Sequence, residues 1–142
     1  MHIAHDCVIG DKTIMANNAT LAGHVSVGDW VIFGGFSGVH QFCKVGAHAF
    51  VGMYAAINRD VPAYTMVSGY PAVPRGINSE GLKRRDFSPE QIRNIKDAYR
   101  LVYRKGLKLA EAIDQVASRA ESQPELDLFL QSLRTSERGL VR

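Results

Sequence analysis

The chain has 142 residues, of which 46% are hydrophobic and 22% are charged, and its formal net charge is +3. This composition supports a packed core in one domain or two small ones. Because no apolar run is long enough to span a bilayer and no signal peptide is apparent, we expect a cytoplasmic protein without membrane insertion.

The first part of the sequence is a run of hexapeptide repeats. An apolar residue recurs every six residues without a gap, at Ile3, Ile9, Met15, Leu21, Val27, Phe33, Val39, Val45, Val51 and Ile57. The residue after it is usually Gly or Ala. Each hexad predicts one short strand and one corner, in which the small residues permit the corner and a narrow core. Three hexads complete one triangular coil, and stacked strands lie about 4.8 Å apart.

The repeat also predicts the state of the two cysteines. Cys7 and Cys43 both occupy the fifth position of a hexad, two coils apart, and so lie roughly 10 Å from each other. A disulfide needs Cα atoms within about 7 Å. We therefore expect two free thiols that fill the core.

Prolines and glycines between residues 62 and 76 predict a connecting loop. We place the β-helix and this loop in residues 1–74 and a small α-helical domain in residues 75–142. The two parts differ in charge. Residues 1–74 carry three basic and four acidic residues (net −1), whereas residues 75–142 carry fourteen and ten (net +4), which favours an anionic partner.

The helical part shows clear boundaries. A short helix is expected at residues 80–85. Ser88, Pro89 and Gln91 form a capping box with proline at the first helical position, and Gly106 is expected to end that helix. Two further helices begin near Leu109 and Pro124.

The repeat brings three of the five histidines to one face. His5, His24 and His40 fall in the first, fourth and seventh hexads, which stack on each other, whereas His48 falls on another face. At the third position, His5, Gly23 and Gln41 should lie nearly above one another. His40 also breaks the small-residue rule of the second position, and such exceptions often mark functional sites.

These residue types suit acyl transfer. An imidazole beside a carboxylate, as in His5–Asp6, can act as a general base, and the backbone N–H of Gly23 can stabilise an oxyanion. Zinc binding by the three histidines is the rival interpretation. We rank it lower because the column lacks the pattern of histidines from adjacent strands, and we predict no metal.

Several strings carry a more specific resemblance. HIAHDC at 2–7, ANNATLAGHVSV at 16–27, VHQFC at 39–43, VGAHAFVG at 45–52, DVPAY at 60–64 and EGLKRR at 80–85 are similar to the UDP-N-acetylglucosamine O-acyltransferase family. The resemblance implies a left-handed parallel β-helix followed by a small helical domain. It implies a homotrimer that moves a 3-hydroxyacyl chain from acyl carrier protein to the 3-hydroxyl of UDP-N-acetylglucosamine, the first step of lipid A biosynthesis, without a cofactor.

The resemblance also assigns roles to residues. His5 resembles the general base, Asp6 its orienting carboxylate and Gly23 the oxyanion donor. The substrate-contacting residues correspond to His24, His40, Gln41, Asn78, Glu80, Arg84 and Arg85, the last four forming the nucleotide-contacting group. Met53 stands where the family sets acyl length, and its bulk favours a chain of about ten carbons.

Two alternatives concern partners and activity. Family members begin with several more coils, so the chain resembles their C-terminal part, and a non-catalytic trimer that retains only carrier-protein or ligand binding is the second hypothesis. A basic row on the capped helix, formed by Arg93, Lys96, Arg100 and Arg104, is expected to dock the acidic carrier protein. Nucleic-acid binding lacks any recognised motif and is not expected.

Overall fold

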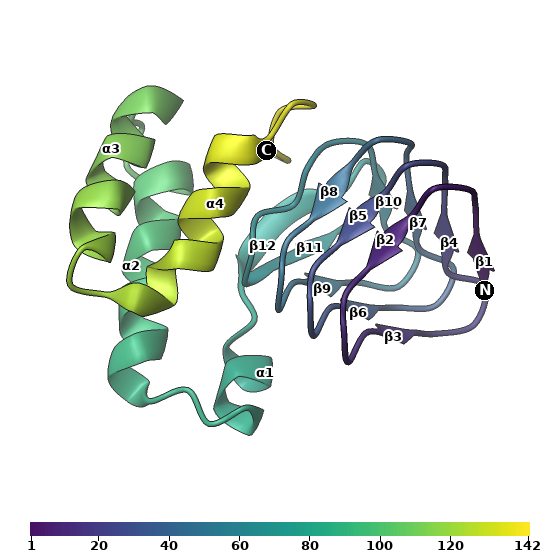
Figure 1. The fold of residues 1–142 in the computed structure, drawn as a ribbon, viewed down its shortest axis with the longest axis horizontal. Helices are drawn as coiled ribbons and strands as arrows, with labels where there is room; N and C mark the ends of the chain where they lie inside the picture. Colours follow the sequence, from purple (N-terminus) through teal and green to yellow (C-terminus); the bar gives the residue numbers. More distant parts are fainter.

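A computed structural model describes residues 1–142 as a triangular coil of short parallel strands followed by a group of helices (Figure 1). Ten two-residue strands end at the ten repeated apolar residues. They are β1 His2–Ile3, β2 Val8–Ile9, β3 Ile14–Met15, β4 Thr20–Leu21, β5 Ser26–Val27, β6 Ile32–Phe33, β7 Gly38–Val39, β8 Lys44–Val45, β9 Phe50–Val51 and β10 Ala56–Ile57. The predicted repeat is therefore confirmed strand by strand.

The strands form three parallel sheets, one for each side of the coil. Their orders are β1-β4-β7-β10, β2-β5-β8 and β3-β6-β9, the last extended by β11 (Thr65–Ser68) and β12 (Val73–Ile77). The register pairs Ile3 with Leu21, and Leu21 with Val39. These 18-residue steps confirm that three hexads make one coil, so residues 18 apart lie above one another.

Three corners join the sheets, and each contains a column of residue pairs. The first corner comprises residues 5–6, 23–24 and 41–42; the second comprises residues 11–12, 29–30 and 47–48; the third comprises residues 17–18, 35–36 and 53–54. The second residue of each pair has φ between 59° and 66°, the left-handed region, and none of these nine residues is glycine. In the second and third coils the N–H groups of these residues donate to the preceding coil, as His24 N does to His5 O at 3.0 Å.

The second-position glycines thus serve another purpose than the one expected. We predicted that these small residues permit the corner, but the backbone turns at the fourth position of the hexad. A Cβ on Gly28 would lie 2.5 Å from the backbone N of Ala47, and one on Gly34 would lie 2.6 Å from that of Met53. These glycines are needed because the next coil passes directly against them.

The coil interior is a single hydrophobic cluster that includes Leu21, Phe33, Val45 and Val51. Cys43 is buried in it, and Cys7 packs against it. Both cysteines are free, as predicted.

The predicted connecting loop is wrong, because much of it is a hairpin. Strand β11, Thr65–Ser68, pairs in parallel with β9 and antiparallel with β12, Val73–Ile77. Pro74 and Gly76 are accommodated because β12 is the edge strand of the sheet, where a missing N–H breaks no ladder. The proposed domain boundary after residue 74 falls within β12 and stays a prediction.

The helices follow the predicted order. They are α1 Ser79–Arg84, α2 Pro89–Tyr103, α3 Leu109–Ala120, the 3-10 helix η1 Pro124–Leu126, and α4 Asp127–Thr135. The capping box at the start of α2 is confirmed, with Ser88 Oγ accepting from Gln91 N and Gln91 Oε1 accepting from Ser88 N. A second cluster, including Leu82, Ile95, Val116 and Phe129, forms between the helices and reaches Tyr64 of the coil.

The C-terminal segment returns to the coil, as the yellow end of the ribbon shows (Figure 1). Buried Asp60 forms backbone hydrogen bonds with this segment: Asp60 N donates to Gly139 O at 2.8 Å, and Val141 N donates to Asp60 O at 2.9 Å. The Asp60 carboxylate accepts from Lys44 N at 2.8 Å and from Ser136 Oγ at 2.6 Å. No helix in the structure has the length and apolarity needed to cross a bilayer.

Candidate active site

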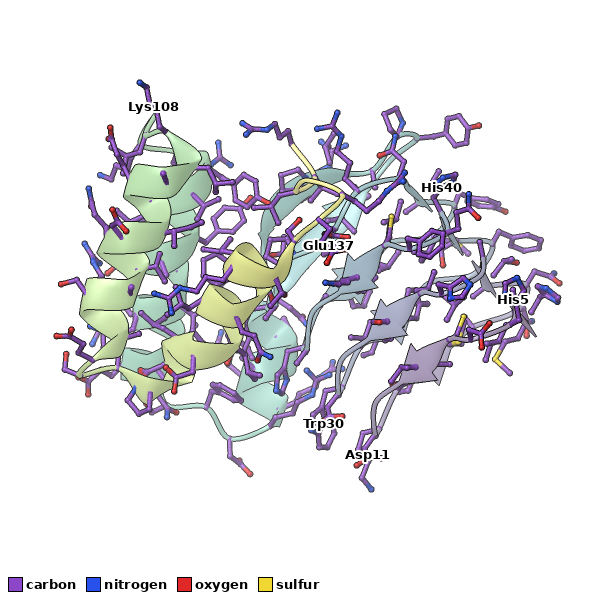
Figure 2. The ribbon with its side chains drawn as sticks, turned by 45° about the horizontal axis from the view of Figure 1, so that its top comes forward. His5, Asp11, Trp30, His40, Lys108 and Glu137 are labelled. Carbon is purple, nitrogen blue, oxygen red and sulfur yellow. The ribbon has the colours of Figure 1, made fainter.

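The first corner places an imidazole against a carboxylate. His5 Nδ1 lies 3.0 Å from Asp6 Oδ2, and both side chains are largely exposed. Figure 2 shows His5 at the end of the coil remote from the helices. The contact uses Nδ1, so Nε2 is the nitrogen left to accept a proton from a bound molecule.

Gly23 lies directly next to His5 in the following coil. A Cβ on Gly23 would lie 2.8 Å from Cε1 and 3.0 Å from Nε2 of His5, which is closer than side chains pack. The N–H of Gly23 donates no hydrogen bond within the chain. The absence of a side chain therefore leaves both the imidazole and a free backbone donor open to a ligand.

His24 completes this group. Its ring meets that of His5 edge-on, with centroids 5.0 Å apart, and its Nε2 lies 3.7 Å from Asp6 Oδ2. On its other side it stacks on Phe42, at 4.6 Å and 3° between planes. Phe42 was missed by the sequence reasoning, although its 18-residue offset from His24 could have identified it.

Gln41 lies at the first corner two coils beyond His5, His40 comes directly before it, and both are exposed. His40 lines a groove of ≈ 510 Å³ on the β1-β4-β7-β10 side, together with Thr20, Ala22 and Tyr70. No hydrogen bond or ring contact joins His40 to His5. The structure thus brings His5, Asp6, Gly23 and His24 together and sets Gln41, with His40 beside it, further along the coil.

The same group offers a set of metal-ligand atoms. Nitrogens of His5 and His24 and an oxygen of Asp6 lie within 4.8 Å of one another, so these three residues could hold a metal ion. A four-coordinate zinc ion needs nitrogen and oxygen ligands at about 2.0–2.2 Å, which would require only small movements of these exposed side chains. His40 is not part of this group, so the structure does not assemble the three-histidine zinc site; base catalysis and metal binding by His5, Asp6 and His24 are the two interpretations that the geometry allows.

The expected nucleotide-contacting residues lie at the second corner, where α1 packs. Asn78 is buried; its Oδ1 accepts from Gly81 N and its Nδ2 donates to His48 O. Glu80 is exposed and lies 3.6 Å from Lys83 Nζ. Arg84 is exposed and Arg85 half-buried.

Arg85 has two partners that the sequence did not reveal. Its Nη1 lies 3.0 Å from His48 Nδ1, and its Cζ lies 5.1 Å from the centre of the Trp30 ring. Burial, and then the positive charge of Arg85, lower the pKa of His48 to about 4, so its imidazole is neutral near pH 7. Trp30 and His48 occupy the second corner 18 residues apart, and that spacing was the available signal.

The remaining predicted residues lie elsewhere. Met53 is exposed at the third corner, where Phe36 and Tyr54 stack at 5.3 Å. Arg93, Lys96 and Arg100 are exposed on α2, and Arg104, the residue directly after the helix, is exposed as well. Three of them, Lys96, Arg100 and Arg104, line a hollow of ≈ 410 Å³ with Arg75 of β12, a fourth cation that the sequence reasoning missed.

Within one chain, the residues predicted to be catalytic, nucleotide-contacting and acyl-length-setting thus lie at three different corners. Figure 2 shows His5 and Trp30 well separated. A single copy does not join these groups into one site.

Comparisons with known proteins agree with this architecture. The family profile described as "Udp N-acetylglucosamine O-acyltransferase; Domain 2" matches residues 60–141. A relative from Thiobacillus denitrificans, named acyl-[acyl-carrier-protein]–UDP-N-acetylglucosamine O-acyltransferase, is 54% identical over 142 residues, which cover 100% of this chain and 55% of the relative. A relative of the same name from Xylella fastidiosa is 55% identical over 142 residues, which cover 99% of this chain and 54% of the relative.

Solved structures extend the match to three dimensions. The structure of LpxA from Acinetobacter baumannii superposes with a TM-score of 0.93 at 48% identity, over 96% of this chain and 54% of that one. The predicted fold class, a left-handed parallel β-helix followed by a small helical domain, is thereby confirmed. The chain spans about half the length of the curated relatives it matches. On these grounds, the chain belongs to the UDP-N-acetylglucosamine O-acyltransferase family.

Proposed function

We propose that this chain carries the acyl-transfer site of its family, moving a 3-hydroxyacyl chain from acyl carrier protein to the 3-hydroxyl of UDP-N-acetylglucosamine, the first step of lipid A biosynthesis. The observation that carries the proposal is the group formed by His5, Asp6 and Gly23. It combines a proton acceptor, a carboxylate that orients it at 3.0 Å, and an unpaired backbone donor beside it.

The chemistry follows from these atoms. His5 Nε2 takes the proton of the sugar 3-hydroxyl as its oxygen attacks the thioester carbonyl carbon. Asp6 Oδ2 accepts from His5 Nδ1, which fixes the tautomer and stabilises the imidazolium that forms. The N–H of Gly23 donates to the oxyanion. When the intermediate collapses, the C–S bond breaks and the carrier thiolate takes the proton from His5, giving an ester and a free thiol.

The separation of the three corners supports a homotrimer. If the second or third corner of one copy faces the first corner of another, the nucleotide-contacting and acyl-length residues reach the His5 group. Exposed apolar side chains at the third corner, including Phe36 and Tyr54, favour burial against a second copy. In this arrangement His24, His40 and Gln41 contact the sugar, phosphate and acyl groups.

The test is turnover with 3-hydroxyacyl carrier protein and UDP-N-acetylglucosamine, comparing the wild-type chain with His5→Ala and Gly23→Ala. Loss of the base should lower kcat by at least about 100-fold. Gly23→Ala pushes a methyl group into the His5 ring and should also lower kcat strongly without unfolding the chain, because the exposed ring can rotate away. Half of the wild-type rate in His5→Ala would contradict the assignment.

A chelator separates base catalysis from the zinc interpretation of the same residues. We propose that no metal takes part, so prolonged treatment with EDTA should leave the rate unchanged. Loss of activity that zinc restores would favour the metal site instead.

The second hypothesis is a non-catalytic trimer that only binds. This hypothesis would be supported if the wild-type chain bound carrier protein or UDP-N-acetylglucosamine measurably but gave no acylated product.

A further inference from the structure

The second corner holds a half-buried guanidinium without a carboxylate partner. Arg85 contacts the imidazole of His48 and the ring of Trp30, and it forms no ion pair within the chain. Burial and the neighbouring charge of Arg84 lower the pKa of Arg85, so the site disfavours its own positive charge. Arginine nevertheless stays protonated, and such a cation is stabilised when an anion binds to it.

His48 is built into the fold as a neutral hydrogen-bond acceptor. It is only 7% exposed and lies in a stack between Trp30 at 6.3 Å and Tyr64 at 5.5 Å, with Phe87 edge-on at 5.3 Å. The ring cannot turn without breaking this stack. Because the imidazole is neutral, Nδ1 can accept a hydrogen bond from Arg85 Nη1.

The backbone of the same residue holds α1. Asn78, the N-cap of α1, donates from Nδ2 to the carbonyl oxygen of His48 at 3.1 Å. Both ends of this short helix therefore depend on residue 48, through Asn78 at its start and Arg85 just after its end. A change to the ring alone leaves the Asn78 contact in place, which makes the two functions of His48 separable.

We infer that His48 is a positioning residue, which holds the guanidinium of Arg85 in place for the diphosphate of the nucleotide sugar without cancelling its charge. The inference rests on the proposed function, in which Arg85 belongs to the nucleotide-contacting group. An acidic residue at this position would orient Arg85 equally well, but it would form an ion pair and remove the charge that attracts the diphosphate.

Three substitutions separate orientation from charge. His48→Phe keeps an aromatic ring in the stack and removes the acceptor. Position 48 has a φ of 63°, and aromatic residues already occupy this conformation at Trp30 and Phe42. His48→Asn restores a neutral acceptor, because its Oδ1 can lie near the place of Nδ1, and Asn tolerates the same φ. His48→Asp supplies an acceptor that also neutralises Arg85.

The readout is binding of UDP-N-acetylglucosamine to the complete chain, measured by calorimetry. Trp30 is the only tryptophan, and Arg85 lies over it, so its fluorescence reports on this site. Loss of a hydrogen bond to a charged group should weaken binding about tenfold in His48→Phe. We expect His48→Asn to bind within about threefold of wild type, and His48→Asp to bind at least as weakly as His48→Phe.

A double substitution shows whether His48 acts through Arg85. If it does, His48→Phe with Arg85→Met should bind no more weakly than Arg85→Met alone, whereas a purely structural effect would add to that loss. Unchanged affinity in His48→Phe, with a clear loss in Arg85→Met, overturns the inference and leaves the proposed function standing. Unchanged affinity in Arg85→Met, or no nucleotide binding by the wild-type chain, contradicts the nucleotide site itself.

Discussion

At the scale of single residues, the corner positions determine which side chains the coil presents to solvent and to possible ligands. Each corner turns through one residue in the left-handed region, and large side chains such as Trp30, Phe42 and Tyr54 occupy that position. They project from the prism and stack from coil to coil at 18-residue intervals. Polar and aromatic side chains are thereby held in fixed columns outside the core.

Met53 gives a prediction for acyl length. It is 63% exposed at the third corner, and its terminal methyl lies 3.9 Å from the place of a Cβ on Gly35. If it ends the acyl groove, Met53→Gly removes about four heavy atoms and should shift the preferred chain from about ten carbons towards about fourteen. Rates with 3-hydroxyacyl carriers of increasing length measure this. The same preference in both proteins would show that Met53 does not set acyl length.

The burial of His48 gives a prediction for acid stability. Burial and Arg85 lower the pKa of His48 from 6.5 to about 4, although the carboxylate of Asp29 opposes this. Between these values the unfolded chain binds the proton and the folded chain does not, so this contribution to stability is complete above about pH 6.5 and falls as pH drops towards 4.

The contribution lost between pH 7 and 4.5 should be about 2 kcal/mol in the free energy of unfolding. Denaturant unfolding at both values measures it, with His48→Asn as the control that lacks this titration. An equal pH dependence in the two proteins would contradict the assignment.

At the scale of elements, α2 combines a buried face with a charged one. Ile95, Ala98 and Tyr99 are buried, whereas Arg93, Lys96, Arg100 and Arg104 face outward. The first and last residues of this helix follow from its capping box and the glycine beyond its end. The additional cation, Arg75, comes from β12, so the hollow between them exists only because the hairpin packs beside α2.

This basic face should make carrier-protein binding sensitive to salt. Added salt shortens the distance over which exposed charges attract each other, which is about 8 Å at physiological ionic strength. The attraction between the basic face and an acidic partner therefore weakens as salt is raised. We therefore expect the KM for acyl carrier protein to rise about tenfold between low salt and 0.5 M salt, and less in Lys96→Gln with Arg100→Gln. Arg119 on α3 lies outside the row, and Arg119→Gln is the control. A KM that does not change with salt would exclude electrostatic docking.

Asp60 joins the coil to the C-terminal segment. Its buried carboxylate accepts from Lys44 N and Ser136 Oγ, and an apolar substitute leaves the half-buried Lys44 N–H unpaired. Asp60→Ala should therefore lower the free energy of unfolding by about 2–3 kcal/mol. Asp11, an exposed corner residue, supplies a matched substitution that should cost little. Equal stability of Asp60→Ala and wild type would show that the C-terminal segment contributes little to the fold.

At the scale of the whole molecule, the three corners of one prism carry three different sets of predicted residues. The first corner has the His5 group, the second has α1 with Arg85, and the third has Met53. Because these corners point in different directions, a site that combined all three sets would need at least two copies.

We expect a homotrimer in solution, which sedimentation at micromolar concentration can measure. Mixing two inactive chains gives a sharper test. His5→Ala supplies an intact second corner and Arg85→Met an intact first corner, so mixed trimers should regain part of the activity. A monomer by sedimentation, or no activity in the mixture, would contradict a site shared between copies.

The sequence by itself determined the coil, its 18-residue period, the column of His5, Gly23 and Gln41, and the helix starts at Ser88 and Leu109. These follow from local periodicity and capping, which depend on near neighbours in the chain. Only the tertiary structure decided that residues 65–77 form a hairpin, that Asp60 holds the C-terminus, and that Arg85 contacts His48 and Trp30. The contacts of Asp60 and Arg85 join residues 37 to 81 positions apart, and no periodic pattern specifies which partner a helix end or a chain end will meet. The hairpin is shorter in range, but it depends on the pairing of β11 with β9 at the end of the coil, which the hexad pattern does not specify.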